Sequence, residues 1–253
     1  MLEGWLAGGL SGSGVTVIDP HPSDRMIALC EKHGCALNPA LPKSDPAVLV
    51  LAIKPQTLDN AGPMLAALVG PETLVVSVLA GKTVANLAAR MSRCGAIVRT
   101  IPNTPASVGR GITAAFPAPT VSDGQRELAD HLLAAIGRVV WVDDENLIDA
   151  ATAVSGSGPA YVFYLAECLA AAGTKAGLPH DVAMALARAT VEGAGELLYR
   201  DALTAPAILR QNVTSPNGTT AAALAVLMAS DGMEPLLVEA VAAAKRRAAE
   251  LSG

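Results

Sequence analysis

The first 143 residues alternate short apolar runs with segments whose apolar residues recur at helical spacing. The run Ala47–Ile53 is continuous, as is typical of a parallel strand that is buried on both faces. The other strand-like runs are Val15–Ile18, Thr73–Val78, Ala96–Ile101 and Arg138–Val142, with the apolar stretch Gly111–Phe116 before the last of them. Because strands and helices alternate throughout, the pattern predicts an α/β fold with a parallel, doubly wound sheet.

Ser and Thr at N-cap positions and Gly at stop positions mark the helices between these strands. The helices predicted in this way run from Ser23 to His33, from Thr83 to about Cys94, and from Ser122 to Gly137. An N-terminal segment, Leu2–Leu10, also has a helical pattern.

From Glu145 onward every segment carries helix formers and small residues at helical spacing. The predicted helices are Asn146–Val154, Ala160–Ala176, His180–Tyr199, Ala205–Val213, Thr219–Met228 and Glu234–Leu251. The chain therefore divides into a sheet domain, residues 1–143, and a helical domain, residues 144–253. Abundant alanine makes a thin core for a single chain, and an interlocked homo-oligomer would share the apolar faces.

The stretch Ser155-Gly-Ser-Gly-Pro159 interrupts the helical pattern between the two halves. Two glycines and a proline are unfavourable inside a helix, whereas Pro159 suits the first turn of the next one. Such a break lets the backbone approach a ligand closely, but by itself it equally predicts a plain turn between helices.

Composition narrows the classes of function. The chain has 253 residues, is 51% hydrophobic and 16% charged, and carries a formal net charge of −5. Its one basic run, Lys245–Arg247, lies among alanines on a predicted helix, so we expect a solvated face and no nucleic-acid partner. The four cysteines form no Cys-x-x-Cys pair and have no His at ligand spacing, which favours reduced thiols, no metal site and a cytoplasmic protein. No apolar run has transmembrane length, so no membrane partner is expected.

Parallel sheets of this kind bind ligands at the carboxyl ends of their strands, which here are Asp19, Ile53–Pro55, Leu79–Gly81 and Pro102–Thr104. Asp19 ends the first of these strands, which corresponds to the second strand of a dinucleotide-binding sheet, where an acidic residue bonds the adenosine ribose 2′-hydroxyl and favours NADH. His21 and Arg25 follow closely in the sequence and are near enough to accommodate the 2′-phosphate of NADPH instead.

A dinucleotide-binding sheet begins with a strand and a Gly-x-Gly-x-x-Gly turn that opens a helix. Here Gly8-Gly9 and Gly12-Ser-Gly14 precede a strand instead. We expect that the natural protein carries about fifteen further residues, the length of a strand and its turn. The alternative is that the chain is complete and has lost cofactor binding.

The second candidate site is the loop Val213–Thr220, which enters a predicted helix. Backbone amides and hydroxyl side chains at a helix N-terminus bind small anions such as carboxylates. The alternative is ordinary N-capping of the helix by Ser215 or Thr219.

Five stretches together resemble the pyrroline-5-carboxylate reductase family over nearly the whole chain. They are Leu51–Gln56, Pro102–Pro105, Asp149–Tyr161, Lys175–Pro179 and Val213–Thr220. The resemblance implies hydride transfer from NADPH or NADH to C5 of L-1-pyrroline-5-carboxylate, giving L-proline in the last step of proline biosynthesis. It also implies a helical domain that dimerises by intertwining, with a site completed across the dimer and often a decamer of five dimers.

The resemblance further implies the residues of the site. Those expected to line the cofactor, besides Asp19, are Ala52, Ile53, Lys54, Pro55, Ala80, Asn103 and Thr104. Those expected to hold the substrate carboxylate are Ser215, Gly218, Thr219 and Thr220, with the catalytic Thr220 hydroxyl near the ring nitrogen. The chain departs from the family pattern in lacking the glycine-rich turn and in carrying Asn217 where a glycine is common, although Asn tolerates left-handed backbone angles.

Two other functions compete with this interpretation. A β-hydroxyacid dehydrogenase also joins a dinucleotide domain to a helical one, but it needs a catalytic lysine on the crossing helix. Lys175, near the end of its predicted helix, is poorly placed for that role. The other alternative is a catalytically impaired, truncated chain that serves as a helical oligomerisation module.

Overall fold

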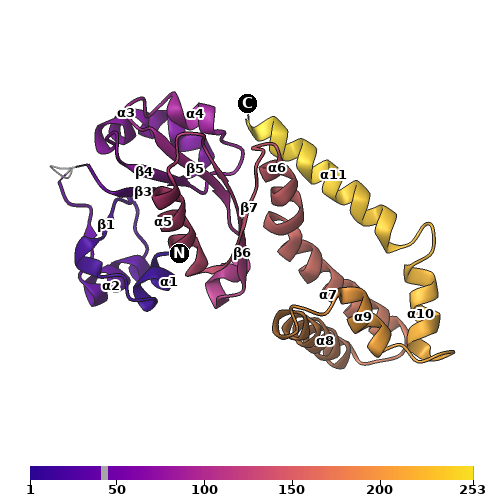
Figure 1. Cartoon of the computed structure of the whole chain (residues 1–253). Coiled ribbons are helices and arrows are strands. Elements are labelled where there is room, and N and C mark those ends of the chain that lie inside the picture. The colour runs from indigo at the N-terminus through magenta and orange to yellow at the C-terminus, as the bar shows by residue number, and fades with distance from the viewer. Residues whose placement is uncertain (41–44, 253) are drawn as a thin grey trace. The chain divides into compact units, whose positions relative to one another are not determined.

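The computed structural model describes residues 1–40 and 45–252. Its main sheet has five strands in the order β3-β4-β5-β6-β7 (Figure 1). Their bounds are Val48–Leu51, Leu74–Ser77, Ala96–Ile101, Gly111–Pro117 and Gly137–Trp141. The fold is α/β as predicted, but the sheet is mixed, because β6 runs antiparallel to β5 whereas the other neighbours are parallel. The connection between β5 and β6 holds only a 3-10 turn, η3 (Thr104–Val108), which is too short for the crossover that a parallel return needs.

A second, two-stranded sheet precedes the main one. In it β1 (Thr16–Val17) pairs in parallel with β2 (Ala36–Leu37), a strand too short for the hydrophobic pattern to indicate. Within the described part of the chain, no strand pairs with the other edge of β1 or with the outer edge of β3. The chain reaches β1 through α1 (Leu2–Ala7) and the 3-10 turn η1 (Gly12–Gly14), so the predicted first helix is shorter than Leu2–Leu10.

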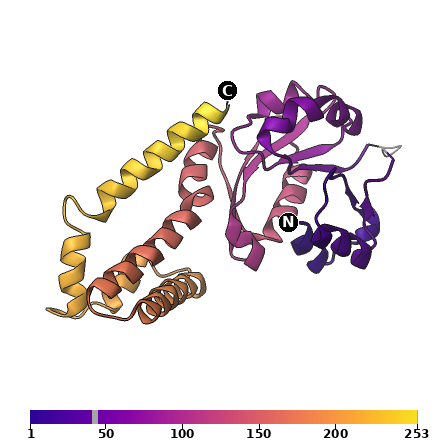
Figure 2. The same cartoon turned by 180° about the vertical axis from the view of Figure 1, so that it is seen from behind.

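Helices cover both faces of the main sheet, as a doubly wound fold requires (Figures 1 and 2). On one face α3 (Leu58–Leu68) and α4 (Val84–Ala88) pack through Leu65 and Leu87 against inward-facing strand residues such as Val75. On the other face α5 (Asp123–Ala134) packs through Leu133 against Val76 and its neighbours. Val75 and Val76 thus bury opposite faces of β4, which explains why the strand is apolar without interruption.

The caps agree with the sequence better than the helix ends do. Ser23 accepts the N–H of Met26 at the start of α2 (Asp24–His33), and Gly34 ends that helix in the left-handed conformation. Thr83 and Ser122 both form capping boxes, at α4 and α5. The predicted ends of these two helices are wrong.

The helix α4 ends at Ala88, and short turns closed by the N–H groups of Arg90, Met91 and Cys94 continue the segment in place of helix. At the other predicted end, Gly137 does not close α5. It begins β7 with φ +144°, where a Cβ atom would lie 2.0 Å from the carbonyl oxygen of Gly111 on β6. This glycine is therefore explained by strand packing and not by helix termination.

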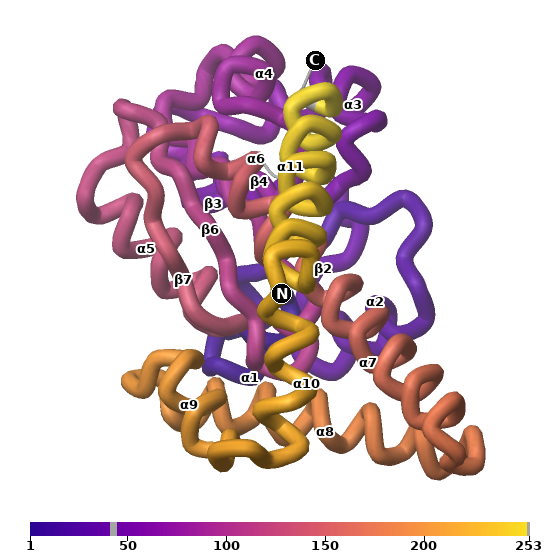
Figure 3. The backbone as a smooth tube through the Cα atoms, turned by 90° about the vertical axis from the view of Figure 1, so that its right-hand side faces the viewer, coloured from indigo at the N-terminus to yellow at the C-terminus, as the bar shows by residue number. Residues whose placement is uncertain are grey.

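The chain beyond β7 is helical throughout (Figure 3). Its helices are α6 (Leu147–Ala151), α7 (Gly158–Lys175), α8 (His180–Arg200), α9 (Pro206–Asn212), α10 (Thr219–Leu227) and α11 (Met233–Ser252). The predicted break at Ser155–Pro159 is smaller than expected, because Thr152–Gly156 forms a π-helical turn and α7 begins again at Gly158. Pro159 stands in the first turn of α7, as predicted.

Two compact units make up the described structure. One contains residues 1–156 with the end of α11 from Lys245, and the other contains Ser157–Ala244. Small residues let α7 and α8 approach closely within the second unit, where a Cβ atom at Gly173 would lie 3.3 Å from Cβ of Ala183. The functional boundary between residues 143 and 144 stays a prediction.

Candidate functional site

Strand register brings most of the predicted cofactor residues to one edge of the main sheet. Leu51, Ser77 and Arg99 lie side by side on β3, β4 and β5. The residues that follow these strands therefore leave the sheet at the same carboxyl edge. Of those residues, Ala52, Lys54 and Thr104 are exposed, whereas Ile53, Pro55, Ala80 and Asn103 are half-buried.

Asn103 has a structural task at this edge. Its Nδ2 donates to the carbonyl oxygen of Ser155 at 3.2 Å, and its Oδ1 accepts the N–H of Ile112 at 3.0 Å. The side chain thus ties the end of β5 to the start of β6 and to the π-helical turn. Since both ends of the amide are engaged by backbone, Asn103 shapes the edge through these bonds.

Asp19 lies after β1, in the two-stranded sheet. Its backbone N–H and carbonyl oxygen pair with the side chain of Asn38, and its Oδ1 accepts the N–H of His21 at 2.9 Å. Arg25 forms an ion pair with Glu3. The Arg25 guanidinium, which is close enough in sequence to Asp19 to accommodate the 2′-phosphate of NADPH, is thus already paired with a carboxylate.

The sequence pattern did not predict a buried cluster of charged side chains near the carboxyl edge of the sheet. Arg99 on β5 has a side chain only 3% exposed, and it contacts Glu145 at 3.2 Å and Asp149 at 2.7 Å. Oε1 of Glu145 also accepts the N–H of Val84, at 2.7 Å. An arginine inside the apolar run Ala96–Ile101 was the available signal, because a charged residue in a buried strand needs partners.

The loop before α10 has the geometry of an anion site. Asn217 adopts a left-handed conformation with φ +59°, as its residue type allows. The N-cap residue of α10 is Gly218, and among the described residues neither Ser215 nor Thr219 caps the helix with a side-chain hydrogen bond. The first N–H groups of a helix have no intrahelical partner, which leaves them available to an anion.

The hydroxyls of this loop are equally available. Thr220 is half-buried, and Ser215 and Thr219 are exposed. Thr214, just before them, differs because its hydroxyl donates to the carbonyl oxygen of Arg210 at 2.6 Å. Thr219 and Thr220 belong to the first turn of α10, where a hydroxyl can reach a ligand at the helix N-terminus.

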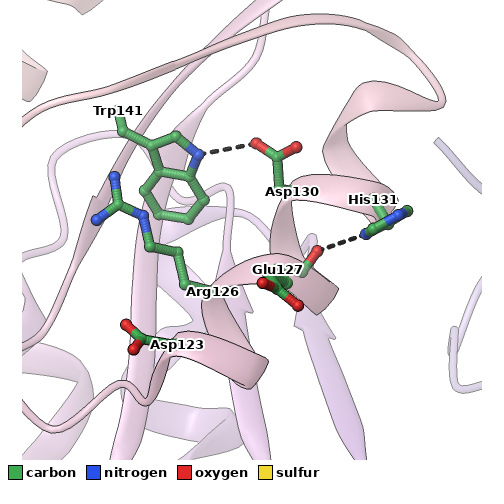
Figure 4. Close-up of a pocket in the computed structure, with 6 residues that line it drawn as sticks. All are labelled: Asp123, Arg126, Glu127, Asp130, His131 and Trp141. Atoms are coloured by element: carbon green, nitrogen blue, oxygen red, sulfur yellow. Dashed lines mark hydrogen bonds between the residues drawn. The ribbon is translucent and has the colours of Figure 1, made fainter.

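No predicted site residue lines the surface pocket formed by α5 and β7 (Figure 4). Its lining residues are Asp123, Arg126, Glu127, Asp130, His131 and Trp141. The guanidinium of Arg126 stacks 4.6 Å from the ring centroid of Trp141, whose Nε1 donates to Asp130 at 2.8 Å. These groups engage one another, and their arrangement supports α5 against β7.

The donor set at the carboxyl edge suits a nicotinamide dinucleotide in part. Small and exposed residues such as Ala52 and Thr104 leave backbone accessible for the nicotinamide end, and the Asp19 carboxylate suits a ribose hydroxyl. No glycine-rich turn opens a helix after a strand in the described ranges, so the described residues include no such cradle for the pyrophosphate. Among the described residues, no group of three or more His, Cys, Asp or Glu side chains is placed to hold a metal ion.

The described helices include none that is both long and apolar enough to cross a membrane. Lys175 is the last residue of α7 and is exposed, which gives no support to a dehydrogenase lysine at that position.

Comparisons with known proteins agree over both halves of the chain. Residues 145–251 match the family model for pyrroline-5-carboxylate reductase dimerisation. A pyrroline-5-carboxylate reductase of Pseudomonas aeruginosa is 43% identical over 83% of this chain and 76% of its own length. One from Bacillus subtilis is 34% identical over 100% of this chain and 86% of its own.

A solved structure extends the likeness to three dimensions. The pyrroline-5-carboxylate reductase of Coxiella burnetii has a TM-score of 0.90 at 34% identity and covers 100% of this chain and 93% of its own. A Plasmodium falciparum pyrroline carboxylate reductase with NADP bound shares the fold, with a TM-score of 0.76 at 24% identity, 99% coverage of this chain and 92% of its own.

Proposed function

Because the chain belongs to the pyrroline-5-carboxylate reductase family, we propose that it reduces L-1-pyrroline-5-carboxylate to L-proline with NADPH or NADH. The observation that carries the proposal is 34% identity with a named reductase across the whole chain. Neither alternative has a comparable observation in its favour. The reaction makes this protein an oxidoreductase of proline biosynthesis.

The cofactor residues act by position. NAD(P)H supplies the hydride when bound, and the protein supplies orientation and electrostatics. Ala52, Ile53, Lys54, Pro55, Ala80, Asn103 and Thr104 line the nicotinamide end, and Asp19 holds the adenosine ribose. Asn103 contributes through the backbone that it braces.

The loop before α10 holds the substrate. The N–H groups of the first turn and the hydroxyls of Ser215 and Thr219 bind the carboxylate, aided by the conformation of Gly218. The Thr220 hydroxyl lies near the ring nitrogen and orients it. An imine nitrogen that arrives protonated needs no strong general acid, so a threonine suffices.

The helical unit gives the protein its oligomeric state. It matches a dimerisation domain, so the chain forms oligomers. Exposed apolar side chains such as Phe163 and Tyr164 on α7 give this unit surface to bury. The finer assignment is a cytoplasmic homodimer whose partner completes the site, or a decamer of five such dimers.

The direct test uses the purified full chain. We expect oxidation of NADH or NADPH that depends on pyrroline-5-carboxylate, with proline formed in equal amount. A β-hydroxyacid substrate serves as the control for the competing dehydrogenase. Reduction of NAD+ or NADP+ by the β-hydroxyacid, with no oxidation of NADH or NADPH by the imine, would refute the proposal.

A further inference from the structure

The buried cluster around Arg99 joins three segments of the sheet unit. The guanidinium on β5 donates to Glu145, just after β7, and to Asp149 on α6. Its Nε is buried without a partner among the described residues, so the side chain is held by its two terminal nitrogens alone. Arg99 is the cation that allows two carboxylates to meet beneath the sheet edge.

Glu145 carries the connection onward to α4. Its Oε1 accepts the N–H of Val84, the first residue of that helix. A carboxylate at a helix N-terminus satisfies a free amide and interacts favourably with the helix dipole. The chain immediately before Val84 is the turn from Ala80 to Thr83, in which Gly81 has φ +70°.

The same turn also packs against α6. Ala80 lies in an apolar cluster with Ile101 at the end of β5 and Ile148 on α6, next to Asp149 in the sequence. Polar and apolar contacts therefore place one short turn relative to β5. Moving Glu145 would release Val84 and change the position of Ala80.

We propose that Arg99 and Glu145 are positioning residues that fix the Ala80–Thr83 turn against the nicotinamide. The inference rests on the proposed function, which places Ala80 beside the cofactor. Charge burial alone is a poor explanation for the cluster, because well-packed apolar residues often stabilise a core as well or better. The contact to Val84 gives the cluster a geometric role that apolar residues would not supply.

Glu145→Ala is the first test, since it removes the acceptor of the Val84 N–H and leaves Arg99 paired with Asp149. We expect amide exchange at Val84 in the cofactor-free chain to rise at least about tenfold. The rate constant for hydride transfer should fall about 10- to 100-fold, because small misplacements of reacting groups have effects of this size. It is measured in single turnovers, and comparison of deuterated with ordinary NADH identifies the hydride-transfer step. The Kd for NADH, from its fluorescence, should change by less than about threefold.

Glu145→Gln is the rescue variant, because its amide oxygen still accepts from Val84 and Arg99. It should recover most of the lost rate and most of the exchange protection. Arg93→Met is the matched control, since it removes the Arg93–Asp45 ion pair, which lies beyond the end of α4. That control should leave both Val84 exchange and the hydride-transfer rate at the wild-type level.

The proposal is overturned if Glu145→Ala leaves Val84 exchange or the hydride-transfer rate unchanged, or if Glu145→Gln is as impaired as the alanine variant. Should the alanine variant not fold, Glu145→Asp withdraws the carboxylate from Val84 by one methylene and takes its place in the comparison. Exchange at Val84 is measured without cofactor or substrate. A wild-type chain that reduces no imine would therefore refute the proposed function, while the exchange comparison would still show whether Glu145 holds the turn.

Discussion

The Thr220 hydroxyl is the group whose removal most directly tests the substrate site. Thr220 lies in the first turn of α10, is half-buried, and its hydroxyl donates no hydrogen bond within the described residues. Thr220→Ala therefore removes no hydrogen bond that the described residues make, and alanine has a higher helix propensity than threonine. A loss of activity in this variant would report on the substrate.

The expected magnitude follows from the bond that the hydroxyl would make. A hydrogen bond to a charged group contributes about 1.5–3 kcal/mol. If Thr220 makes that bond to the ring nitrogen in the transition state, kcat/KM for the imine should fall about 10- to 150-fold in the alanine variant. The Kd for NADH should stay within about twofold, because the hydroxyl has no role in cofactor binding.

Steady-state kinetics and NADH titration of the purified variant give both quantities. Thr220→Ser keeps the hydroxyl and should recover most of the activity. Thr214→Val is the matched control, because the Thr214 hydroxyl donates to the carbonyl oxygen of Arg210 and has no role assigned in substrate binding. Equal losses in kcat/KM and NADH affinity, or no loss at all in Thr220→Ala, would refute the role assigned to Thr220.

Three further predictions concern other parts of the chain. Asp19→Ala should lower kcat/KM for NADH relative to NADPH, because an acidic residue favours the ribose 2′-hydroxyl; a wild type that strongly prefers NADPH would contradict this. Gly137→Ala should lower the melting temperature by several degrees, since the added Cβ would lie 2.0 Å from the Gly111 carbonyl oxygen; calorimetry with Gly124→Ala, whose Cβ meets nothing within 4 Å, is the comparison. Phe163→Glu should weaken self-association measured by light scattering, because Phe163 is 64% exposed in the single chain; an unchanged oligomer would place the interface elsewhere.

The central strands β4 and β5 could be predicted closely from the sequence because they are buried on both faces. The segment Ala96–Ile101 matches β5 at both ends, and Ala47–Ile53 contains β3. The same hydrophobic pattern could not predict the direction of a strand. The antiparallel course of β6 follows from the length of the connection after Ile101, and apolar residues look alike in either direction.

The helix starts were predictable and the helix ends were not. A side chain such as Ser122 makes its capping bond within one turn, so the signal is local. The end of α5 depends instead on the pairing of the next strand, β7, with β6. In that pairing Gly137 of β7 lies opposite Gly111 of β6. A glycine has more than one physical use, and sequence alone does not distinguish helix termination from close strand packing.

The candidate site divides in the same way. Residues that follow strands, such as Ala52 and Asn103, could be assigned to one edge because parallel strands end together. What Asn103 does there could not be foreseen, since its partners Ser155 and Ile112 lie on separate segments. A resemblance in sequence identifies such a residue without saying whether it contacts the ligand or holds the backbone that does.

Arg99 and Asn103 belong to one structural solution. Arg99 lies within β5 and Asn103 just after it. Both hold the chain that follows β7, Arg99 through Glu145 and Asp149 and Asn103 through Ser155. The π-helical turn at residues 152–156 lies at the end of that chain, and such turns are frequent at functional sites. The segment Ser155–Pro159 is rich in small residues, which by themselves would leave its backbone free to move. The hydrogen bonds from Arg99 and Asn103 hold the chain that leads into this segment against a rigid strand. The glycines are therefore compatible with a fixed geometry at the carboxyl edge of the sheet.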